Sequence, residues 1–179
     1  MVGCLTFFNQ QVFAFLYYSG ALSFDIDNHD PDATKLDVTV VRRKGRTEVV
    51  RLVARLLARL HEEGICLLDT KPENFLIDET GGVWLLDLEQ ARESCNPRSK
   101  AWDISLFLHY LLRGFPSNEL VNEILDAFSE EYLSSGGSVS TIKNALSPTL
   151  SLPFFLLLSP PSLLNFRVKS ASIVRGLRY

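Results

Sequence analysis

The sequence predicts an α+β fold that is mainly helical and contains one β-hairpin. Three observations lead to this prediction: a helical period of apolar residues after position 46, two short apolar runs flanking a turn at positions 75–86, and apolar stretches of helical length beyond position 101. The 179 residues, of which 46% are hydrophobic, suffice for one ordinary domain and a short extension. They do not suffice for a two-lobed enzyme of full size.

The composition excludes some partners and favours one compartment. Eighteen basic and 21 acidic residues give a formal net charge of -3, so the chain has no general attraction to nucleic acid. Cys4, Cys66 and Cys95 form no C-x-x-C pair, and a chain of this length needs no disulfides, so we expect a reducing, cytoplasmic location. Cys66 is interpreted as a small buried hydrophobe, and the three histidines, which lack metal-ligand spacing, as structural.

Two apolar stretches, at residues 4–22 and 150–164, raise the question of membrane insertion. The first lacks the basic start of a signal peptide, and the second is broken by three prolines and is shorter than the roughly 20 residues that span a bilayer. We expect both to be buried or to face a partner, and no transmembrane segment. A peripheral membrane contact through residues 150–178 stays an alternative, because four Lys and Arg residues follow the second stretch.

The elements follow in chain order. No element is predicted for residues 1–34, which are first apolar and then acidic. Residues 36–41 are β-branched and alternate in part, which predicts a short strand that ends at the basic turn 42–46. Residues 47–63 have a broad apolar stripe at helical spacing, with arginines on the opposite face. Thr47 is expected to cap this helix, and Gly64 to end it.

The hairpin comes next. Residues 75–77 and 83–86 are apolar runs joined by a turn that contains two glycines, which predicts two antiparallel strands. The polar loop 69–74 enters the first strand, and Asp87 ends the second. Helical apolar patterns then cover residues 102–112, 119–133 and 141–146.

Four polar residues lie at the ends of this hairpin. Asp69, Lys71 and Asn74 precede its first strand, and Asp87 follows its second. Antiparallel pairing brings those two ends together, so we expect the four side chains to converge. Oxygen ligands for Mg²⁺, a carboxylate that can orient a hydroxyl, and an ammonium for phosphate suit metal-assisted phosphoryl transfer. The simpler interpretation is that such residues only cap turns.

Three segments resemble the protein-kinase-like enzymes. Residues 61–77, HEEGICLLDTKPENFLI, are similar to their catalytic loop, and residues 83–89, VWLLDLE, to the strand and D-F-G element that follow it. Residues 100–104, KAWDI, look like the start of the helix whose Asp braces the loop. The resemblance covers about residues 48–115 and implies a mainly helical kinase-like carboxyl-terminal lobe at residues 48–179, with a degenerate or truncated amino-terminal lobe or hinge at residues 1–47.

The resemblance implies a role for each of the converging residues. Asp69 matches the catalytic Asp that orients or accepts the proton of the acceptor hydroxyl, and Lys71 the loop Lys that contacts the γ-phosphate. Asn74 and Asp87 match the two magnesium ligands, so that Lys71, Asn74 and Asp87 would together hold the cofactors ATP and Mg²⁺. Asp103 matches a structural brace.

The departures from the family pattern narrow the type of kinase. Leu67 and Leu68 stand where the family has His and Arg or Gly, so regulation through a phosphorylated activation loop is not expected. Glu89 replaces the Gly of D-F-G, and only fifteen residues separate Asp87 from Asp103. This is similar to the compact atypical kinases: RIO-like kinases, the kinase of the archaeal KEOPS complex, and lipopolysaccharide kinases acting on heptose or Kdo. The residues do not choose among these branches.

The nucleotide-binding part of the family pattern is not found in the sequence. It has no G-x-G-x-x-G, its upstream lysines Lys35 and Lys44 lack a V-A-x-K context, and its first Glu is Glu48.

Two hypotheses about the function follow from these observations. The first is an atypical kinase-like phosphotransferase that moves the ATP γ-phosphate to a hydroxyl of a protein Ser or Thr, a sugar or a lipid, once a nucleotide lobe is supplied. The second is a noncatalytic kinase-like binding module or gene fragment.

Overall fold

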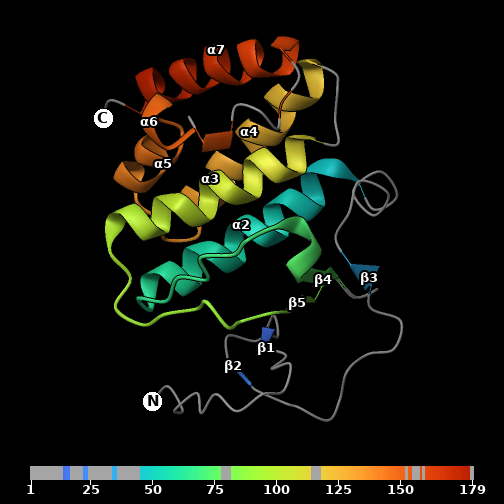
Figure 1. Cartoon of the computed structure of the whole chain (residues 1–179), viewed down its shortest axis with the longest axis vertical. Helices are drawn as coiled ribbons and strands as arrows, with labels where there is room; N and C mark the ends of the chain where they lie inside the picture. Colours follow the sequence, from blue (N-terminus) through green and yellow to red (C-terminus); the bar gives the residue numbers. More distant parts are fainter. Residues whose placement is uncertain are drawn as a thin grey trace.

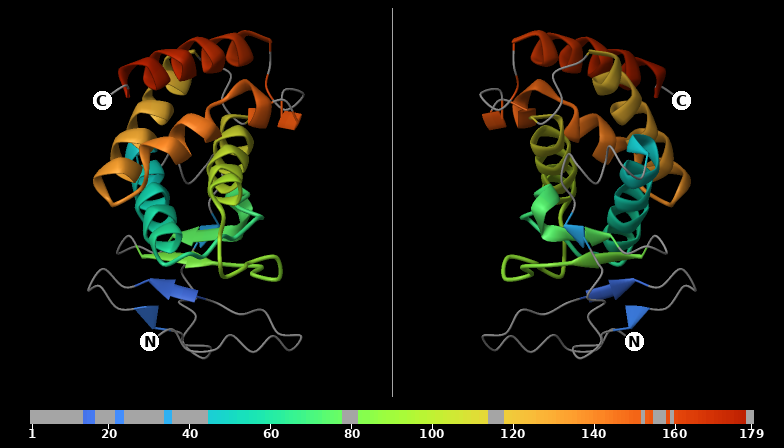
Figure 2. Two further views of the ribbon diagram at one scale, coloured as in Figure 1. Left: turned by 90° about the vertical axis from the view of Figure 1, so that its left-hand side faces the viewer. Right: turned by 90° about the vertical axis from the view of Figure 1, so that its right-hand side faces the viewer.

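The structure is a computed structural model of the chain. It describes residues 14–16, 22–23, 34–35, 45–77, 82–113, 118–151, 153–154, 158 and 160–177. Helices form a stack over one face of a small sheet, and the last helix lies at the end of the molecule opposite the sheet (Figures 1 and 2). The α+β class and the mainly helical content are confirmed.

All pairings in the sheet are antiparallel, in the order β2-β1-β5-β4-β3. The strands are β1 (Ala14–Leu16), β2 (Leu22–Ser23), β3 (Thr34–Lys35), β4 (Phe75–Ile77) and β5 (Val83–Leu85). The predicted hairpin is the β4–β5 pair, with Phe75 opposite Leu85 and Ile77 opposite Val83. The strand predicted at residues 36–41 lies outside the described residues. The same sheet includes strands from both sides of position 47, where we expected the two regions of the chain to meet.

The described chain also contains six α-helices and one short 3-10 helix, joined by loops. They are α2 (Arg46–Glu62), η1 (Pro72–Asn74), α3 (Pro97–Arg113), α4 (Asn118–Ser134), α5 (Val139–Ala145), α6 (Pro148–Ser151) and α7 (Pro160–Gly176). No helix in these described ranges is long and apolar enough to cross a membrane.

Helix α2 follows its apolar period closely. Val49, Val53 and Leu57 are completely buried, as the predicted stripe requires. The predicted cap is wrong: Gly45 holds the cap position, and Thr47 is already inside the helix. Gly64 ends the helix as predicted, because its φ of 78° is readily adopted only by glycine.

Helix α3 begins five residues before the apolar pattern that predicted it. Asn96 explains the earlier start, because its side-chain oxygen accepts hydrogen bonds from the backbone N–H groups of Arg98 and Ser99, both at 2.9 Å. Pro97 fits the first helical position, where no N–H is needed. The start of α3 is therefore set by a polar cap and a proline, which an apolar period does not reveal.

The core continues from the sheet through the helices by aromatic contacts. The Phe75 ring of β4 lies 5.6 Å from that of Phe107 in α3, which lies 5.8 Å from that of Phe128 in α4. All three side chains are fully buried. Since such pairs add to the free energy gained by burial, they hold the hairpin against α3 and α4. This packing fixes the position of the loop between α2 and β4.

Helix α7 was not predicted as a helix. Its first residues are the end of the proline-broken apolar stretch 150–164, which we expected to be buried or to face a partner. Phe154 and Leu158 from that stretch are buried, at 6% exposure each, whereas Leu164 is 64% exposed. The stretch is therefore partly core and partly surface.

Candidate functional site

The loop between α2 and β4 is held by one buried carboxylate from α3. The Oδ2 of Asp103 accepts a hydrogen bond from the N–H of Leu67 at 2.9 Å, and its Oδ1 accepts one from the N–H of Leu68 at 2.7 Å. The Thr70 hydroxyl donates to the backbone carbonyl of Asp103 at 2.6 Å. Because Asp103 is completely buried, the two charge-assisted bonds to its carboxylate are shielded from water. The prediction that Asp103 braces the loop is confirmed.

His61 extends this brace to a third helix. Its Nε2 lies 3.2 Å from the Asp103 Oδ2, and its Nδ1 lies 2.8 Å from the hydroxyl of Tyr132 in α4. The Lys100 ammonium also donates to the His61 carbonyl, which ties the start of α3 to the end of α2. Sequence reasoning did not find Tyr132 as part of this network. The available signal was a tyrosine among the apolar positions of a helix, because a buried hydroxyl requires a partner.

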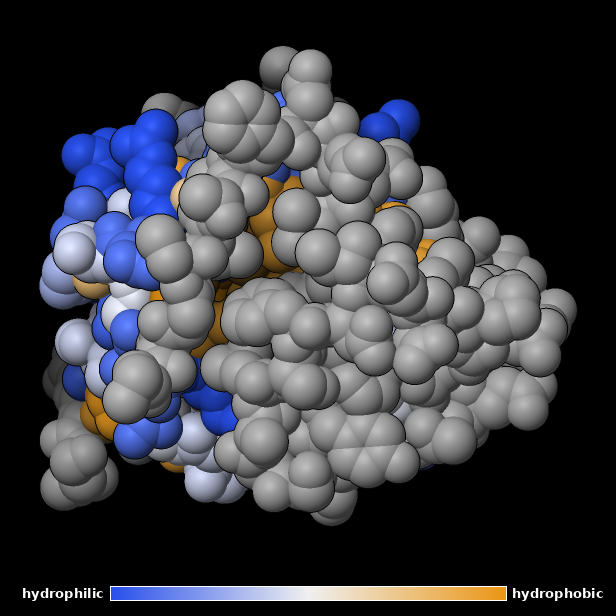
Figure 3. Space-filling model, turned by 90° about the horizontal axis from the view of Figure 1, so that it is seen from below, coloured by the Kyte–Doolittle hydropathy of each residue, from blue (hydrophilic) through white to orange (hydrophobic). Residues whose placement is uncertain are grey.

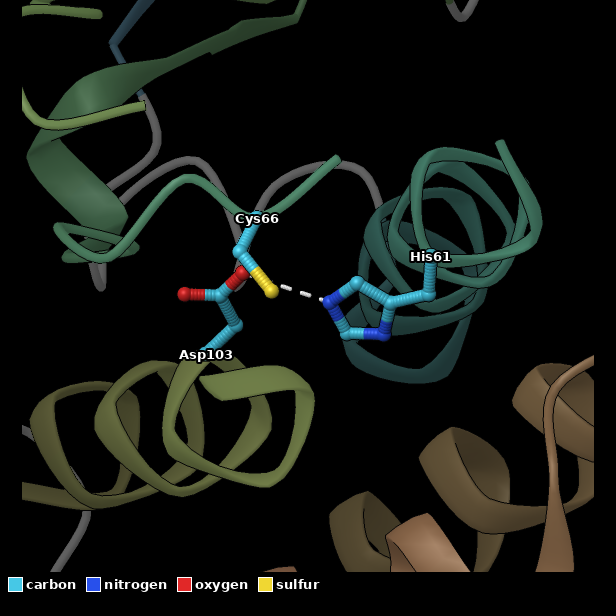
Figure 4. Close-up of side chains that lie close together, drawn as sticks. All are labelled: His61, Cys66 and Asp103. Carbon is cyan, nitrogen blue, oxygen red and sulfur yellow. Dashed lines mark hydrogen bonds and ion pairs between the residues drawn. The ribbon is translucent and has the colours of Figure 1, made fainter. Parts of the chain in front are cut away.

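His61, Cys66 and Asp103 form a compact buried trio, shown in Figure 4. Their potential metal-ligand atoms lie within 4.8 Å of one another. Both Asp103 oxygens already accept loop N–H groups and both ring nitrogens of His61 lie at hydrogen-bond distance from partners. The trio is therefore better suited to bracing the loop than to holding a cation.

Cys66 corrects one expectation. It is buried as predicted, but it forms a disulfide with Cys95, with Cα atoms 5.4 Å apart. The expectation of unpaired cysteines, from which we inferred a reducing location, is therefore wrong. An isolated antiparallel bridge between Cys66 and Arg92 brings the two segments together. The spacing of 29 residues concealed the pair, because only this tertiary bridge places Cys95 beside the loop.

Asp69 and Lys71 form a partly buried ion pair at the centre of the loop. The Lys71 Nζ lies 2.9 Å from the Asp69 Oδ1 and 3.0 Å from Oδ2. The hydrogen bond to the Asp69 carboxylate, aided by its charge, raises the pKa of Lys71 above its ordinary value, although desolvation works in the opposite direction. The side chain of Asp69 is 12% exposed and that of Lys71 is 34% exposed, so both can still be reached.

Asn74 connects the loop to the end of the hairpin. Its side-chain Nδ2 donates to the backbone carbonyl of Asp69 at 2.9 Å, and its own carbonyl accepts from the N–H of Leu86 at 2.8 Å. Because Leu86 immediately precedes Asp87, this bond places the exit of β5 beside Asn74. The structure therefore brings Asp69, Lys71 and Asn74 together, and hydrogen-bonds Leu86, the residue before Asp87, to Asn74.

Asp87 is exposed, and its side chain has no hydrogen bond or ion pair with any residue that the structure describes. The following segment is polar and largely exposed. In the view of the molecule from the side of the sheet, hydrophilic side chains gather along one edge of the described surface (Figure 3). Because the Asp87 carboxylate has no partner among the described residues, it is available to an external cation.

Two residues of the site have positive φ angles that non-glycine residues rarely adopt. Leu68 has a φ of 63° and Asp87 a φ of 54°. The Leu68 N–H bonds to Asp103, and its carbonyl accepts from the Trp102 Nε1 at 3.2 Å, so both of its backbone polar groups are held. Backbone conformations of this kind cost conformational energy and are concentrated at functional sites. Here they occur at Leu68, directly before Asp69, and at Asp87.

The mainly helical lobe, the braced loop and the hairpin together define a protein-kinase-like domain. Residues 24–132 match the Lipopolysaccharide kinase (Kdo/WaaP) family, which is more than half of the chain. The chain therefore belongs to this family. Of the branches that the sequence left open, this match selects the lipopolysaccharide-kinase type.

The curated relatives that the chain matches are also kinases. Mouse ribosomal protein S6 kinase alpha-1 is 30% identical over 109 residues, which are 61% of this chain and 15% of that protein. Mouse and human ribosomal protein S6 kinase alpha-6 are each 29% identical over 133 residues, which are 65% of this chain and 17% of each relative. The chain thus spans less than a fifth of the length of these relatives.

Proposed function

We propose that this chain carries the catalytic and metal-binding part of an ATP-dependent phosphotransferase that modifies a hydroxyl acceptor. The observation that carries the proposal is the Asp69–Lys71 pair, which lies beside Asn74 on a loop whose Leu67 and Leu68 N–H groups are held by Asp103 of α3. Family membership supports the same reaction class.

Asp69 acts in this proposal as the group that orients the acceptor hydroxyl and accepts its proton. Its carboxylate is only slightly exposed, so an acceptor oxygen that enters the site can replace one of its contacts with Lys71. Lys71 carries the positive charge that compensates the transferring phosphate. A lysine is protonated at neutral pH, and the neighbouring Asp69 raises the pKa of Lys71 further above its ordinary value.

Asn74 and Asp87 fit a magnesium site. The Asn74 Nδ2 is used on the Asp69 carbonyl, which leaves its Oδ1 as an oxygen ligand, and the Asp87 carboxylate is free of partners among the described residues. Magnesium bound there would neutralise charge on the phosphates of ATP. Dependence on ATP favours a cytoplasmic location. The acceptor classes remain a protein Ser or Thr, a sugar or a lipid.

A titration with Mg-ATP tests the proposal. We expect Mg-ATP to raise the melting temperature, and ATP with EDTA to have a smaller effect. Asp69→Asn should keep nucleotide binding but lose at least about a hundredfold in the rate of ³²P transfer from labelled ATP to water or acceptor, because general base catalysis supplies roughly that factor. Asp87→Asn should lose the magnesium-dependent part of the thermal shift.

Glu63→Gln is the matched control, since Glu63 is an exposed carboxylate at the start of the same loop and has no part in the proposal. It should behave like the parent protein. A chain without any Mg-ATP effect, or an Asp69→Asn variant with full turnover, would overturn the proposal.

A noncatalytic kinase-like binding module is the second candidate. It is favoured by the sequence, which contains neither a Gly-rich loop nor a Lys in the V-A-x-K context. The Mg-ATP titration separates the two functions, because a binding module of this kind predicts no magnesium-dependent shift and no transfer of phosphate.

A further inference from the structure

A second pocket lies far from the candidate site, between α5 and α7. Its volume is about 630 Å³, within the range of small-molecule sites. Helix α7 is at the end of the molecule opposite the sheet, as the views in Figures 1 and 2 agree. The pocket is therefore separate from the loop that carries Asp69, and any ligand it holds does not share that site.

The walls of the pocket are apolar and its charged groups are all basic. Leu146, Phe166 and Val174 supply apolar surface, while Lys143, Arg167 and Arg175 supply positive charge. None of the described lining residues is acidic. A pocket with this distribution favours a ligand that has an apolar body and a negative group.

The basic residues of α5 and α7 differ in whether another part of the protein neutralises their charge. Lys169, the remaining cation of α7, lies outside the pocket and pairs with Asp126 of α4. Lys143 has no ion pair with any of the described residues. The Arg175 Nε donates to the Ala171 carbonyl at 3.1 Å, which holds its side chain along the helix. Lys143 and Arg175 therefore place positive charge on two different helices that line one pocket.

Ser170 adds a polar group inside the pocket. It is only 3% exposed, and its Oγ has no hydrogen-bond partner in the part of the chain that the structure describes. A buried hydroxyl without a partner is costly, so the position favours a ligand oxygen that accepts its hydrogen bond. This observation points to a ligand independently of the basic residues.

Exposed apolar side chains continue the pocket surface along α7. Leu164 and Val168 are 64% and 60% exposed. Their spacing puts them on the same stripe of the helix as Ala171 and Arg175, which line the pocket. An acyl chain longer than the pocket would find further apolar surface there.

We propose that this pocket binds an anionic amphiphile, a molecule with an acyl-like apolar chain and a phosphate or carboxylate head group. The chain lies against Leu146, Phe166 and Val174, and the head group meets Lys143 and Arg175. The Ser170 hydroxyl donates to a ligand oxygen. This site is additional to the proposed phosphotransfer and does not depend on it.

Calorimetric titration of the full chain with dodecyl phosphate, below its micelle concentration, tests the proposal. We expect saturable binding of one molecule per chain and a higher melting temperature. Dodecyltrimethylammonium has the same chain with the opposite charge, and inorganic phosphate has the head group alone. Neither should bind detectably. Equal binding of the cationic amphiphile, or no saturable binding of dodecyl phosphate, would overturn the proposal.

Charge reversal locates the site. Lys143→Glu and Arg175→Glu should each weaken dodecyl phosphate binding at least tenfold, and Ser170→Ala should weaken it about threefold, since one neutral hydrogen bond contributes about that much. Arg113→Glu changes the net charge equally at an exposed position outside the pocket lining and should bind like the parent protein. An equal loss in Arg113→Glu would show that only net charge matters, which contradicts the proposed site.

Vesicles identify the source of the ligand. Flotation with phosphatidylglycerol vesicles, compared with phosphatidylcholine vesicles, shows whether the same pocket takes its ligand from a bilayer. Retention on the anionic vesicles that Lys143→Glu abolishes supports a lipid source. Binding of dodecyl phosphate without flotation supports a soluble amphiphile. Flotation that Lys143→Glu and Arg175→Glu leave unchanged contradicts the proposal.

Discussion

Tyr132 is the outer member of a hydrogen-bonded chain that reaches the candidate catalytic loop. Its hydroxyl meets His61, His61 meets Asp103, and Asp103 accepts the N–H groups of Leu67 and Leu68. Burial raises the pKa of Tyr132 to about 12, so its hydroxyl stays protonated throughout the neutral range. The position of one phenol ring on α4 therefore bears on the loop that holds Asp69.

Gly137 is the residue that leaves room for this ring. A Cβ at position 137 would come within 2.1 Å of the Tyr132 Cε1, and the ring is too well buried to move freely. We expect Gly137→Ala to lower the free energy of unfolding by about 2 kcal/mol, the usual cost of overpacking. Urea denaturation measures this loss. Gly176→Ala, where a Cβ meets nothing within 4 Å, should change it little.

His109 makes stability depend on pH in the mildly acidic range. It is completely buried, and desolvation lowers its pKa from 6.5 to about 4, against the opposing effect of its hydrogen bond with the Ser105 carbonyl. Below pH 6.5 the unfolded chain binds a proton at this position and the native chain does not. Stability that is fully present above pH 6.5 is therefore lost as the pH falls toward 4.

The expected loss from His109 is about 2 kcal/mol between neutral pH and roughly pH 5, because each unit of pKa difference is worth about 1.4 kcal/mol. His109→Phe removes the titrating group and keeps an aromatic ring beside Phe154 and Phe166. Its stability should fall less steeply over this interval in urea denaturation. The slope is compared rather than the absolute stability, so a general destabilisation does not obscure the result. Equal slopes in the two proteins would contradict the prediction.

Among single residues, the sequence could predict roles that depend on neighbours in the chain, but not contacts between distant positions. Asp103 was predicted as a brace because its motif context is local, and Asn96 could have been found as a cap by its place before Pro97. The Tyr132–His61 contact could not be predicted, because its partners are separated by 71 positions and meet only through helix packing. The same reason hid the disulfide of Cys66.

At the scale of elements, α2 and α4 are joined by ion pairs beside their apolar contact. The Arg55 Nε and Nη2 both lie 2.8 Å from the Glu131 Oε1, and the Arg51 Nη2 lies 2.9 Å from the Glu130 Oε2. Partial burial works to raise the pKa of Glu131, but the hydrogen bond and charge of Arg55 outweigh it, so the pKa is lowered overall. Glu131 therefore stabilises the fold while it is ionised.

Arg55→Ala should lower the free energy of unfolding by about 1 kcal/mol at neutral pH, the upper end for a pair that is still partly solvated. The difference from the parent protein should shrink below the ordinary Glu131 value of 4.5, because the depressed pKa contributes stability only while the carboxylate is charged. Arg59→Ala, an exposed position on the same helix, is the control and should have little effect. A difference that persists unchanged at low pH would rule out the ionic explanation.

Elements with a clear period were predicted well, and those without one were not. Helix α2 and the hairpin agree with prediction to within one or two residues, because burial of one face of α2 imposes its apolar period and complete burial makes both strands continuous apolar runs. Helix α7 escaped prediction because its apolar residues do not form one stripe: Phe166 is buried in the core, while Leu164 and Val168 face solvent. Some residues of α7 pack in the core and others line the pocket, so its apolar residues lie on more than one face of the helix.

At the scale of the whole molecule, α7 connects the helices farthest from the sheet with the core that supports the loop. The Phe166 ring, 1% exposed, lies 4.4 Å from the His109 ring of α3, and the Lys169–Asp126 ion pair joins α7 to α4. Helix α3 also carries Asp103. A continuous set of packed elements therefore runs from the second pocket to the candidate catalytic loop.

Phe166→Ala tests whether this set unfolds as one unit. Truncating a buried phenylalanine costs about 3 kcal/mol or more, and we expect a loss of that size in denaturation by urea. The two tryptophans, Trp84 in β5 and Trp102 at the start of α3, report on the sheet and the loop by fluorescence, while circular dichroism reports on all helices. Since one core joins them, both signals should shift to the same new midpoint.

Leu164→Ala, at an exposed position on the same helix, should shift neither signal appreciably. Loss of helical signal at a lower urea concentration than the change in fluorescence would show that α7 unfolds on its own and does not support the loop.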